Sequence, residues 1–315
     1  MAVTEYFNFG ADIIAGYTTD FAGDYGYNTA KDVPHYEALA ARYGMTAEQL
    51  VRVNQKHTDR VLRVDMTNGG EGILRGGRRC ADAACDPAAT SPGTVAGVAC
   101  DPAATTPGTP SGAACDDTAA TASGTPTDAA CGMLSRSCDS TGRPLNSEYV
   151  PHDALITDTR GLMLCVVTAD CVPILFYDPV RQAIGAAHSG RRGCFKEIAL
   201  QTVKKMGEAY GSNPGDIRCL LGPYLSQTHH EVNAWDVEEA YAHFNEAECE
   251  TFIQSRGEKR YVDMGTAIRI SLMRAGVSEE HITDNHVCTY EHEELYSWRR
   301  DHGPKCNILT YIALR

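Results

Sequence analysis

The strongest constraint on the fold comes from one stretch, residues 164–193 (LCVVTADCVPILFYDPVRQAIGAAHSGRRG). It contains two apolar runs, Leu164–Thr168 and Ala183–Ala187, and each run ends in residues with reactive side chains. Apolar runs of this length, bounded by turn residues, are typical of buried strands. The stretch therefore predicts two buried strands, each followed by residues with reactive side chains.

A thiol and an imidazole follow these two runs. Cys171 comes after the first run and His188 after the second, 17 positions later. If the strands are adjacent, both side chains can face one cavity. Cysteine and neutral histidine are good zinc ligands, and they are also the pair that cysteine nucleophiles use. Cysteine is often simply buried, so a core thiol beside a core histidine explains the same residues. The pair alone leaves these three interpretations open.

Charge and hydropathy limit the partners of the protein. The 315 residues carry a net charge of −13 and have a pI near 5.3, which argues against nucleic acid or an anionic membrane as the main partner. No apolar run approaches the roughly 18–20 residues of a membrane helix. Residues 1–20 lack the basic start of a signal peptide. We therefore expect a cytoplasmic protein without a membrane or nucleic-acid partner; its oligomeric state does not follow from the sequence.

The composition changes abruptly at residues 78–144. No aromatic residue occurs between positions 78 and 148, and a degenerate repeat places Cys85, Cys100, Cys115 and Cys131 at spacings of 15, 15 and 16 residues. Such sequence has too little apolar bulk to offset the entropy of folding. We expect residues 78–144 to be a disordered, low-complexity insertion in a single catalytic domain formed by residues 1–77 and 145–315. A thiol-rich metal buffer built on the repeat cysteines is the non-enzyme alternative.

The rest of the sequence mixes helix and strand patterns without regular βαβ alternation. Residues 195–210 have the clearest helical periodicity. Arg192 and the loop amides before this helix then lie at a helix N-terminus, which suits an anion. The patterns predict further helices at 34–43, 46–55, 234–244 and 264–275, and further strands at 59–66, 152–158, 217–221 and 307–314.

Several motifs, taken in order, resemble one known family. They are NQKH at 54–57, DALIT at 153–157, TADCVPILFYD at 168–178, AAHSGRRG at 186–193, LGP at 221–223, EV at 231–232, CT at 288–289 and SWRRD at 297–301. The family is that of the laccase-domain or multicopper polyphenol oxidase-like proteins, whose members are now mostly described as purine nucleoside phosphorylases with adenosine deaminase activity. The resemblance implies an α+β fold with layered α/β/β/α architecture and mixed sheets. It also implies that His57, Cys171 and His188 hold a metal.

The resemblance further implies a zinc-dependent enzyme whose partners are a purine nucleoside and phosphate. It would cleave adenosine, inosine and methylthioadenosine by phosphorolysis and would also deaminate adenosine. Three protein ligands leave zinc one open position, where a water can be activated. The expected catalytic residues are Cys171, His188, Asp170 and Arg192. We expect Asn54, Arg299 and Arg300 to bind substrate or phosphate, because the guanidinium fork of arginine matches phosphate bidentately.

Some positions depart from the family pattern. Asp20, Ser189 and Arg191 replace the residues usual there, and His229 and His230 occupy a segment where relatives vary. These departures bear on the substrate preference rather than on the metal ligands.

Two other enzymes remain as alternatives. One is a Cys–His hydrolase acting on peptidoglycan precursors, with Cys171 as nucleophile and His188 as base. The other is a copper-dependent polyphenol oxidase, since copper also accepts cysteine and histidine ligands. A multicopper oxidase typically uses His-x-His pairs, however, and the 11 histidines of this chain include no such pair.

Overall fold

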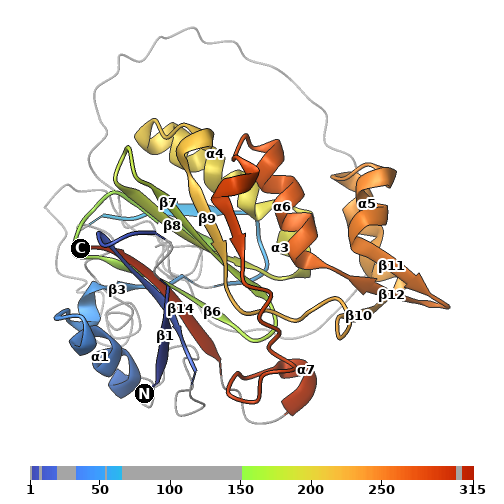
Figure 1. Ribbon diagram of the computed structural model, residues 1–315, viewed down its shortest axis with the longest axis horizontal. Helices are drawn as coiled ribbons and strands as arrows, with labels where there is room; N and C mark the ends of the chain where they lie inside the picture. Colours follow the sequence, from blue (N-terminus) through green and yellow to red (C-terminus); the bar gives the residue numbers. More distant parts are fainter. Residues whose placement is uncertain (1, 7–8, 20–32, 54, 66–150, 303–306) are drawn as a thin grey trace, which may run out of the picture. The chain divides into compact units, whose positions relative to one another are not determined.

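The computed structural model describes residues 2–6, 9–19, 33–53, 55–65, 151–302 and 307–315. The insertion expected at 78–144 lies outside these residues. Two large mixed sheets form the centre of the described part (Figure 1). The first has the strand order β1-β2-β14-β6-β3 and the second the order β13-β9-β7-β8-β5-β4. Three neighbouring pairs are parallel (β3 with β6, β4 with β5, β13 with β9) and the others are antiparallel.

The strands of both sheets are short. Those of the five-stranded sheet are β1 (Val3–Glu5), β2 (Ile13–Thr18), β14 (Ile308–Leu314), β6 (Met163–Thr168) and β3 (Leu50–Val51). Those of the six-stranded sheet are β13 (Ile282–Asp284), β9 (Arg218–Leu221), β7 (Val172–Asp178), β8 (Ala183–Ser189), β5 (Ala154–Thr157) and β4 (Val61–Arg63).

Alternating side chains on the central strands build three apolar layers, because successive residues of a strand point to opposite faces. In β7, Leu175 and Tyr177 pack between the two sheets, whereas Ile174 and Phe176 pack against helices on the other face. In β6, Leu164 belongs to the layer between the sheets. Since both faces of these strands are covered, the strands read as continuous apolar runs.

Helices cover the outer faces of the two sheets. The helix α1 (Val33–Arg42) packs on the five-stranded sheet through Tyr36 and Leu39. The helices α4 (Ile198–Tyr210) and α6 (Met264–Arg274) pack on the six-stranded sheet, where Val203 and Ile268 join its apolar layer. The order helix, sheet, sheet, helix confirms the expected α/β/β/α architecture.

Smaller elements complete the described part. A three-stranded sheet has the order β10 (Glu231–Asn233), β12 (Lys259–Val262), β11 (Ile253–Arg256). The short helices are α3 (Arg191–Phe195), α5 (Glu246–Phe252) and α7 (Trp298–Asp301), and the 3-10 turns are η1 (Ala47–Gln49), η2 (Pro214–Asp216), η3 (Ala234–Ala242) and η4 (Glu279–His281). Among the described residues, no helix is both long and apolar enough to cross a membrane.

Most predicted elements are confirmed, and three differ. The helix predicted at 46–55 is only the turn η1, because Leu50 and Val51 pair with β6 as an edge strand. The helix predicted at 195–210 begins at Ile198, since Glu197 adopts a left-handed conformation (φ 57°) that interrupts it. The segment predicted as a helix at 234–244 is instead the 3-10 helix η3.

The sequence spacing suggested that the two strands of the reactive stretch are neighbours, but they do not lie side by side. The first run forms β6 and the second forms β8, and these belong to different sheets. The neighbour of β8 is β7, which begins directly after Cys171. The thiol therefore reaches the end of β8 from the turn between the sheets.

Candidate active site

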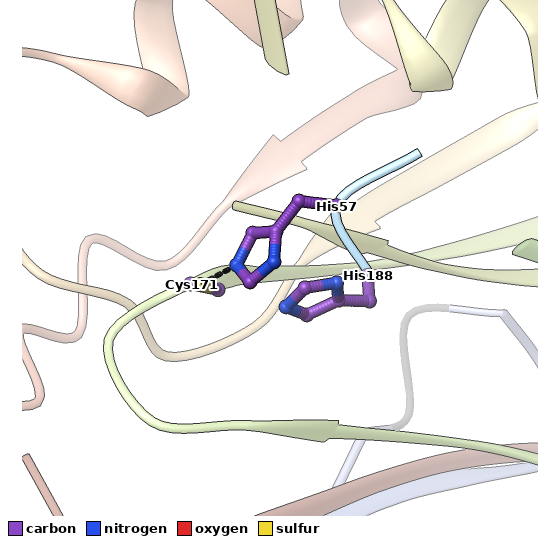
Figure 2. Close-up of side chains that lie close together, drawn as sticks. All are labelled: His57, Cys171 and His188. Atoms are coloured by element: carbon purple, nitrogen blue, oxygen red, sulfur yellow. Dashed lines mark hydrogen bonds between the residues drawn. The ribbon is translucent and has the colours of Figure 1, made fainter. Parts of the chain in front are cut away.

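His57, Cys171 and His188 come together at one end of the six-stranded sheet (Figure 2). His57 lies in the loop before β4, Cys171 in the turn before β7, and His188 near the end of β8. Their potential ligand atoms all lie within 4.8 Å of one another. The Cys171 Sγ lies 3.8 Å from His57 Nε2, and the two imidazole rings have centroids 4.9 Å apart at an angle of 75°. The register of β7 and β8, with Val172 opposite Ser189, explains why the thiol lies beside His188.

A buried carboxylate, Asp153, holds the backbone of the His57 loop and the His188 ring in place. Its Oδ1 accepts a hydrogen bond from the His57 backbone N–H at 3.0 Å and lies 2.8 Å from His188 Nδ1. Its Oδ2 accepts from the N–H of Lys56 at 3.2 Å and from the N–H and hydroxyl of Thr58 at 2.6 and 2.7 Å. Because Nδ1 of His188 is bound to Asp153, its Nε2 is the nitrogen left for a ligand.

Gly190 permits the close approach of His57 to the thiol. A Cβ atom at this position would lie 2.2 Å from His57 Cδ2, 2.7 Å from His57 Nε2 and 3.0 Å from Cys171 Sγ. Such distances are shorter than van der Waals contact, so any side chain at position 190 would displace the imidazole. The second glycine of this motif, Gly193, has only ordinary contacts at 3.4 Å and beyond.

The electrostatics of the site favour a charged pair. Burial opposes the thiolate, but His188 and His57 lower the pKa of Cys171 to about 6. Burial also opposes the imidazolium, yet Cys171 and Asp153 raise the pKa of His188 to about 9. Hydrogen bonds from His188 and Thr58 overcome burial and lower the pKa of Asp153 to about 2. The sulfur is therefore disposed to be a thiolate, which is the form that binds metals.

The donor set fits a zinc ion. One sulfur and two nitrogens are ligands that zinc prefers, and three protein ligands are usual in its catalytic sites. The carboxylate behind His188 is the outer partner that metal-bound histidines commonly have. Copper accepts the same donors. The expected metal ligands are thus all brought together, and the geometry also provides their support.

A cavity of about 290 Å³ opens beside the three side chains. Its walls are partly basic and partly apolar, and they come from segments far apart in the sequence. The lining residues are His57, Ala169, Asp170, Cys171, Arg191, Arg192, Leu225, His230, Met264, Trp298 and Arg299.

Three arginines reach this cavity, and each is held differently. Arg191 forms an ion pair of 2.6 Å with Asp236, whereas Arg192 is more exposed and lies 3.7 Å from Glu239. Arg299 donates from Nη2 to the carbonyl oxygen of Glu231 at 2.9 Å. Among the described residues, Arg299 has no carboxylate within ion-pair distance.

Asp170 connects the turn that carries Cys171 to the loop that carries Arg299. One carboxylate oxygen accepts from the Thr289 hydroxyl at 2.6 Å, and the other accepts from the Arg299 backbone N–H at 2.7 Å. The residue has a left-handed backbone (φ 83°), which aspartate tolerates better than most side chains. Both oxygens are engaged, so this geometry suits a positioning role for Asp170, which the sequence analysis expects among the catalytic residues, at the cavity wall.

Arg300, also expected to bind substrate or phosphate, is not among the residues that line the cavity. Its guanidinium donates to the carbonyl oxygens of Thr289, Tyr290, His292 and Leu295 and to the carboxylate of Asp301. These bonds hold the preceding loop in its conformation and occupy the Arg300 guanidinium. Of Arg299 and Arg300, only Arg299 therefore lines the cavity. Asn54, the other residue expected to bind substrate, lies outside the described residues.

Sequence reasoning assigned no role to several residues of the site. The sequence signals of Asp153 are its place in the DALIT motif and its position directly before the buried strand β5. His230 lines the cavity and donates from Nδ1 to the Val262 carbonyl at 3.0 Å. Burial, with the charges of Arg299 and Arg191, lowers the pKa of His230 to about 4. The ring is therefore neutral at pH 7, and its Nε2 can accept a hydrogen bond.

The fold and the site together define a layered α+β protein with a Cys/His centre beside a basic cavity. The family model described as multi-copper polyphenol oxidoreductase laccase matches residues 129–315. The chain belongs to this family, as its motifs predicted.

Relatives and solved structures are similar to different extents. "Purine nucleoside phosphorylase YlmD" of Bacillus subtilis is 32% identical over 184 residues, which cover 58% of this chain and 66% of the relative. "Purine nucleoside phosphorylase" of Bacteroides thetaiotaomicron is 36% identical over 167 residues, 51% of this chain and 60% of the relative. The matches thus span slightly less than two thirds of these proteins. The crystal structure of the Bacillus licheniformis hypothetical protein YfiH has the same fold, with a TM-score of 0.69, 20% identity and coverage of 96% of this chain and 93% of that chain.

Proposed function

We propose that the protein is a zinc-dependent purine nucleoside phosphorylase that also deaminates adenosine. The observation that carries this proposal is the position of the His57–Cys171–His188 centre beside a cavity that Arg191, Arg192 and Arg299 line. The names of the two relatives above support the same reaction class. A metal-ligand centre and an anion-binding wall in one cavity suit a reaction between a nucleoside and phosphate.

The arginines would bind the phosphate. Arginine offers parallel N–H donors that pair with two phosphate oxygens at once. Arg299 is the leading candidate, because its backbone is held by Asp170 and its guanidinium has no competing carboxylate among the described residues. Arg192 is the second, since its contact with Glu239 at 3.7 Å is long and solvent-exposed. Exposed ion pairs of this kind contribute little, so phosphate can replace the carboxylate.

The apolar part of the cavity would hold the purine. Trp298 is half exposed, and Leu225 and Met264 line the same cavity. Stacking of a base on an aromatic ring contributes about 1–3 kcal/mol. The neutral His230 adds a hydrogen-bond acceptor, which suits a ribose hydroxyl or an N–H of the base. In this proposal, the arginine side chains would bind the anion and the apolar side chains would bind the base.

Phosphorolysis then requires that a phosphate oxygen attacks C1′ of the ribose as the N-glycosidic bond breaks. The bonding electrons leave with the purine, which takes up a proton, and ribose 1-phosphate is the second product. The protein residues orient the two reactants and limit the access of water, and holding reactants in line is a large part of catalysis. Zinc bound to His57, Cys171 and His188 would act as a Lewis acid that makes a water nucleophilic at neutral pH, as replacement of the adenine amino group by oxygen requires.

Product analysis tests the proposal directly. The zinc-loaded protein is incubated with adenosine, inosine or methylthioadenosine, with and without phosphate, and the free base, inosine and (methylthio)ribose 1-phosphate are quantified. We expect base release that depends on phosphate and that disappears in Cys171→Ala. Formation of inosine without base release would show deamination without a working phosphate site. No conversion of any nucleoside would refute the proposal.

A Cys–His hydrolase is the second candidate. The 3.8 Å separation of Cys171 Sγ and His57 Nε2, with His188 beside them, also suits a cysteine nucleophile and its base. Peptidoglycan precursors are the substrates to test for this activity. The two candidates respond oppositely to a chelator, because the hydrolase needs the free thiol and the phosphorylase needs the bound metal.

A further inference from the structure

A second group of potential ligands lies outside the active-site cavity. His229, Cys288 and Glu291 place an imidazole nitrogen, a sulfur and a carboxylate oxygen within 4.8 Å of one another. They belong to two loops about sixty residues apart in the sequence, one after β9 and one after β13. None of the three lines the cavity beside Cys171. We propose that these three residues form a second zinc-binding site.

The two loops are joined firmly where the ligands meet. Tyr224 donates its N–H to the carbonyl oxygen of Val287 at 3.0 Å, and Thr289 donates its N–H to the carbonyl oxygen of Tyr224 at 3.0 Å. These bonds form a bridge between Tyr224 and Cys288, so the thiol is placed by backbone structure. A ligand set held by the fold loses little conformational entropy when it binds an ion.

Each ligand is also oriented individually. The His229 ring stacks on Tyr290 at 4.1 Å with an angle of 16° between the planes, and its Nε2 lies 3.0 Å from Glu291 Oε1. The Cys288 sulfur is buried and accepts a hydrogen bond from the Ser226 N–H at 3.4 Å, which fixes its position. The ligand atoms of a tetrahedral zinc ion also lie within 4.8 Å of one another, since zinc–ligand bonds are about 2.0–2.3 Å long.

The donor types select the ion. One thiolate, one imidazole and one carboxylate are all ligands of zinc, whereas calcium and magnesium prefer oxygen alone. The three ligands differ in solvent exposure. Cys288 is buried, whereas the side chains of His229 and Glu291 are 26% and 56% exposed. An ion can therefore enter from the solvent, and water can complete its coordination.

The two loops that hold the proposed zinc site also form part of the active-site cavity. The loop of His229 also carries Leu225 and His230, and the loop of Cys288 continues to Trp298 and Arg299, all of which line the active-site cavity. Zinc bound to both loops would fix two walls of that cavity relative to each other.

Zinc titration of the full-length protein tests the site. The protein is stripped of metal and titrated with Zn²⁺ in competition with a chromophoric chelator, for wild type, His229→Ala, Glu291→Gln and Cys171→Ala. We expect His229→Ala and Glu291→Gln each to bind one zinc fewer than wild type. Cys171→Ala should retain the second site and lose the first. Cysteines elsewhere in the chain are the same in all these proteins, so zinc bound to them cancels in the comparison.

His292→Ala is the matched control. His292 Nδ1 lies 3.0 Å from Glu294 Oε1 and is also surface-exposed, but no thiol of the described residues joins this pair. It should bind as much zinc as wild type. With Co²⁺ in place of Zn²⁺, the spectrum of His229→Ala should lose sulfur-to-cobalt charge-transfer intensity, as should that of Cys288→Ser. Equal zinc content and equal cobalt spectra in wild type and His229→Ala would overturn the proposal.

Discussion

At the scale of single residues, the site depends on groups that do not line the cavity. Asp153 receives five hydrogen bonds, from the loop of His57 and from the His188 ring. One carboxylate thus fixes two of the three proposed ligands. A carboxylate that orients a metal-bound histidine also makes it a better donor.

We predict that Asp153→Asn lowers zinc affinity at the Cys171 site about 10- to 100-fold, the range usual for partners of metal ligands. The amide retains one oxygen, but its NH2 group would face N–H and O–H donors that now bind a carboxylate oxygen. Zinc titration measures the affinity, and Asp216→Asn in η2 is the control. An unchanged affinity would mean that His188 needs no orientation by Asp153.

Gly190 supports the site through its lack of a side chain. We predict that Gly190→Ala lowers zinc affinity at least about 10-fold, because its Cβ would lie 2.2 Å from the His57 ring. Overpacking of this kind costs about 1–3 kcal/mol of stability, so the protein should remain folded by circular dichroism. Gly193→Ala, in the same motif but with contacts of 3.4 Å or more, should bind zinc as wild type does. Equal effects of both substitutions would contradict this steric explanation.

At the scale of elements, the active-site cavity depends on how α7 is attached to the turn before β7. Asp170 accepts the N–H of Arg299 at 2.7 Å, in the first turn of α7. We predict that Asp170→Asn raises the KM for phosphate about 10-fold and leaves zinc content unchanged, because the amide cannot accept from both Thr289 and Arg299. Steady-state kinetics at varied phosphate measures this effect. A loss of kcat with an unaltered KM for phosphate would instead favour a direct role in proton transfer.

The same helix begins with Trp298, which we expect to carry the base. Loss of stacking worth about 1–3 kcal/mol predicts that Trp298→Ala raises the KM for the nucleoside about 5- to 100-fold. The KM for phosphate should change much less, since Arg299 keeps its bonds to Asp170 and Glu231. Trp235, which is 67% exposed and lies outside the cavity, provides the control Trp235→Ala. Equal effects on both substrates would argue against stacking.

Sequence reasoning succeeded where a local pattern determines the structure. The apolar runs of β6 and β8 and the period of α4 are confirmed because burial on both faces, or on one helical face, leaves a direct trace in the sequence. It failed at Leu50 and Val51, where pairing with β6 overrides a helical pattern. It could not distinguish Arg299 from Arg300, because only the folded loop shows that four backbone carbonyls and Asp301 occupy the Arg300 guanidinium, whereas Arg299 donates to a single carbonyl.

At the scale of the whole molecule, the layers explain why the site can be assembled from such distant segments. His57 and Cys171 are 114 residues apart, yet β4 pairs with β5 and β5 with β8, so the loop before β4 reaches the end of β8. The third ligand became visible in the sequence only through the family motif NQKH. No local spacing connects it to the other two, since sheet order rather than chain order brings it there.

The same sheet order determines what a deletion of the repeat segment should do, since we propose that residues 78–144 are an insertion in one catalytic domain. The strands β4 and β5 are parallel neighbours, so the chain between them must cross from the end of one to the start of the other, which takes about a dozen residues or more. Deletion of residues 80–143 leaves fourteen residues after Asp65 and seven before Pro151, enough for this crossing.

We therefore predict that the deletion variant folds, binds zinc at the Cys171 site and keeps at least about half of the proposed phosphorolysis activity. Loop closure depends only weakly on loop length, so the unfolding temperature should change by a few degrees at most. The measurements are thermal unfolding, zinc titration and phosphate-dependent base release, with Cys171→Ala in the same background as the inactive control. If all zinc binding vanished with the repeat cysteines, the protein would instead be a metal buffer, and the Cys/His centre beside β8 would not be its metal site.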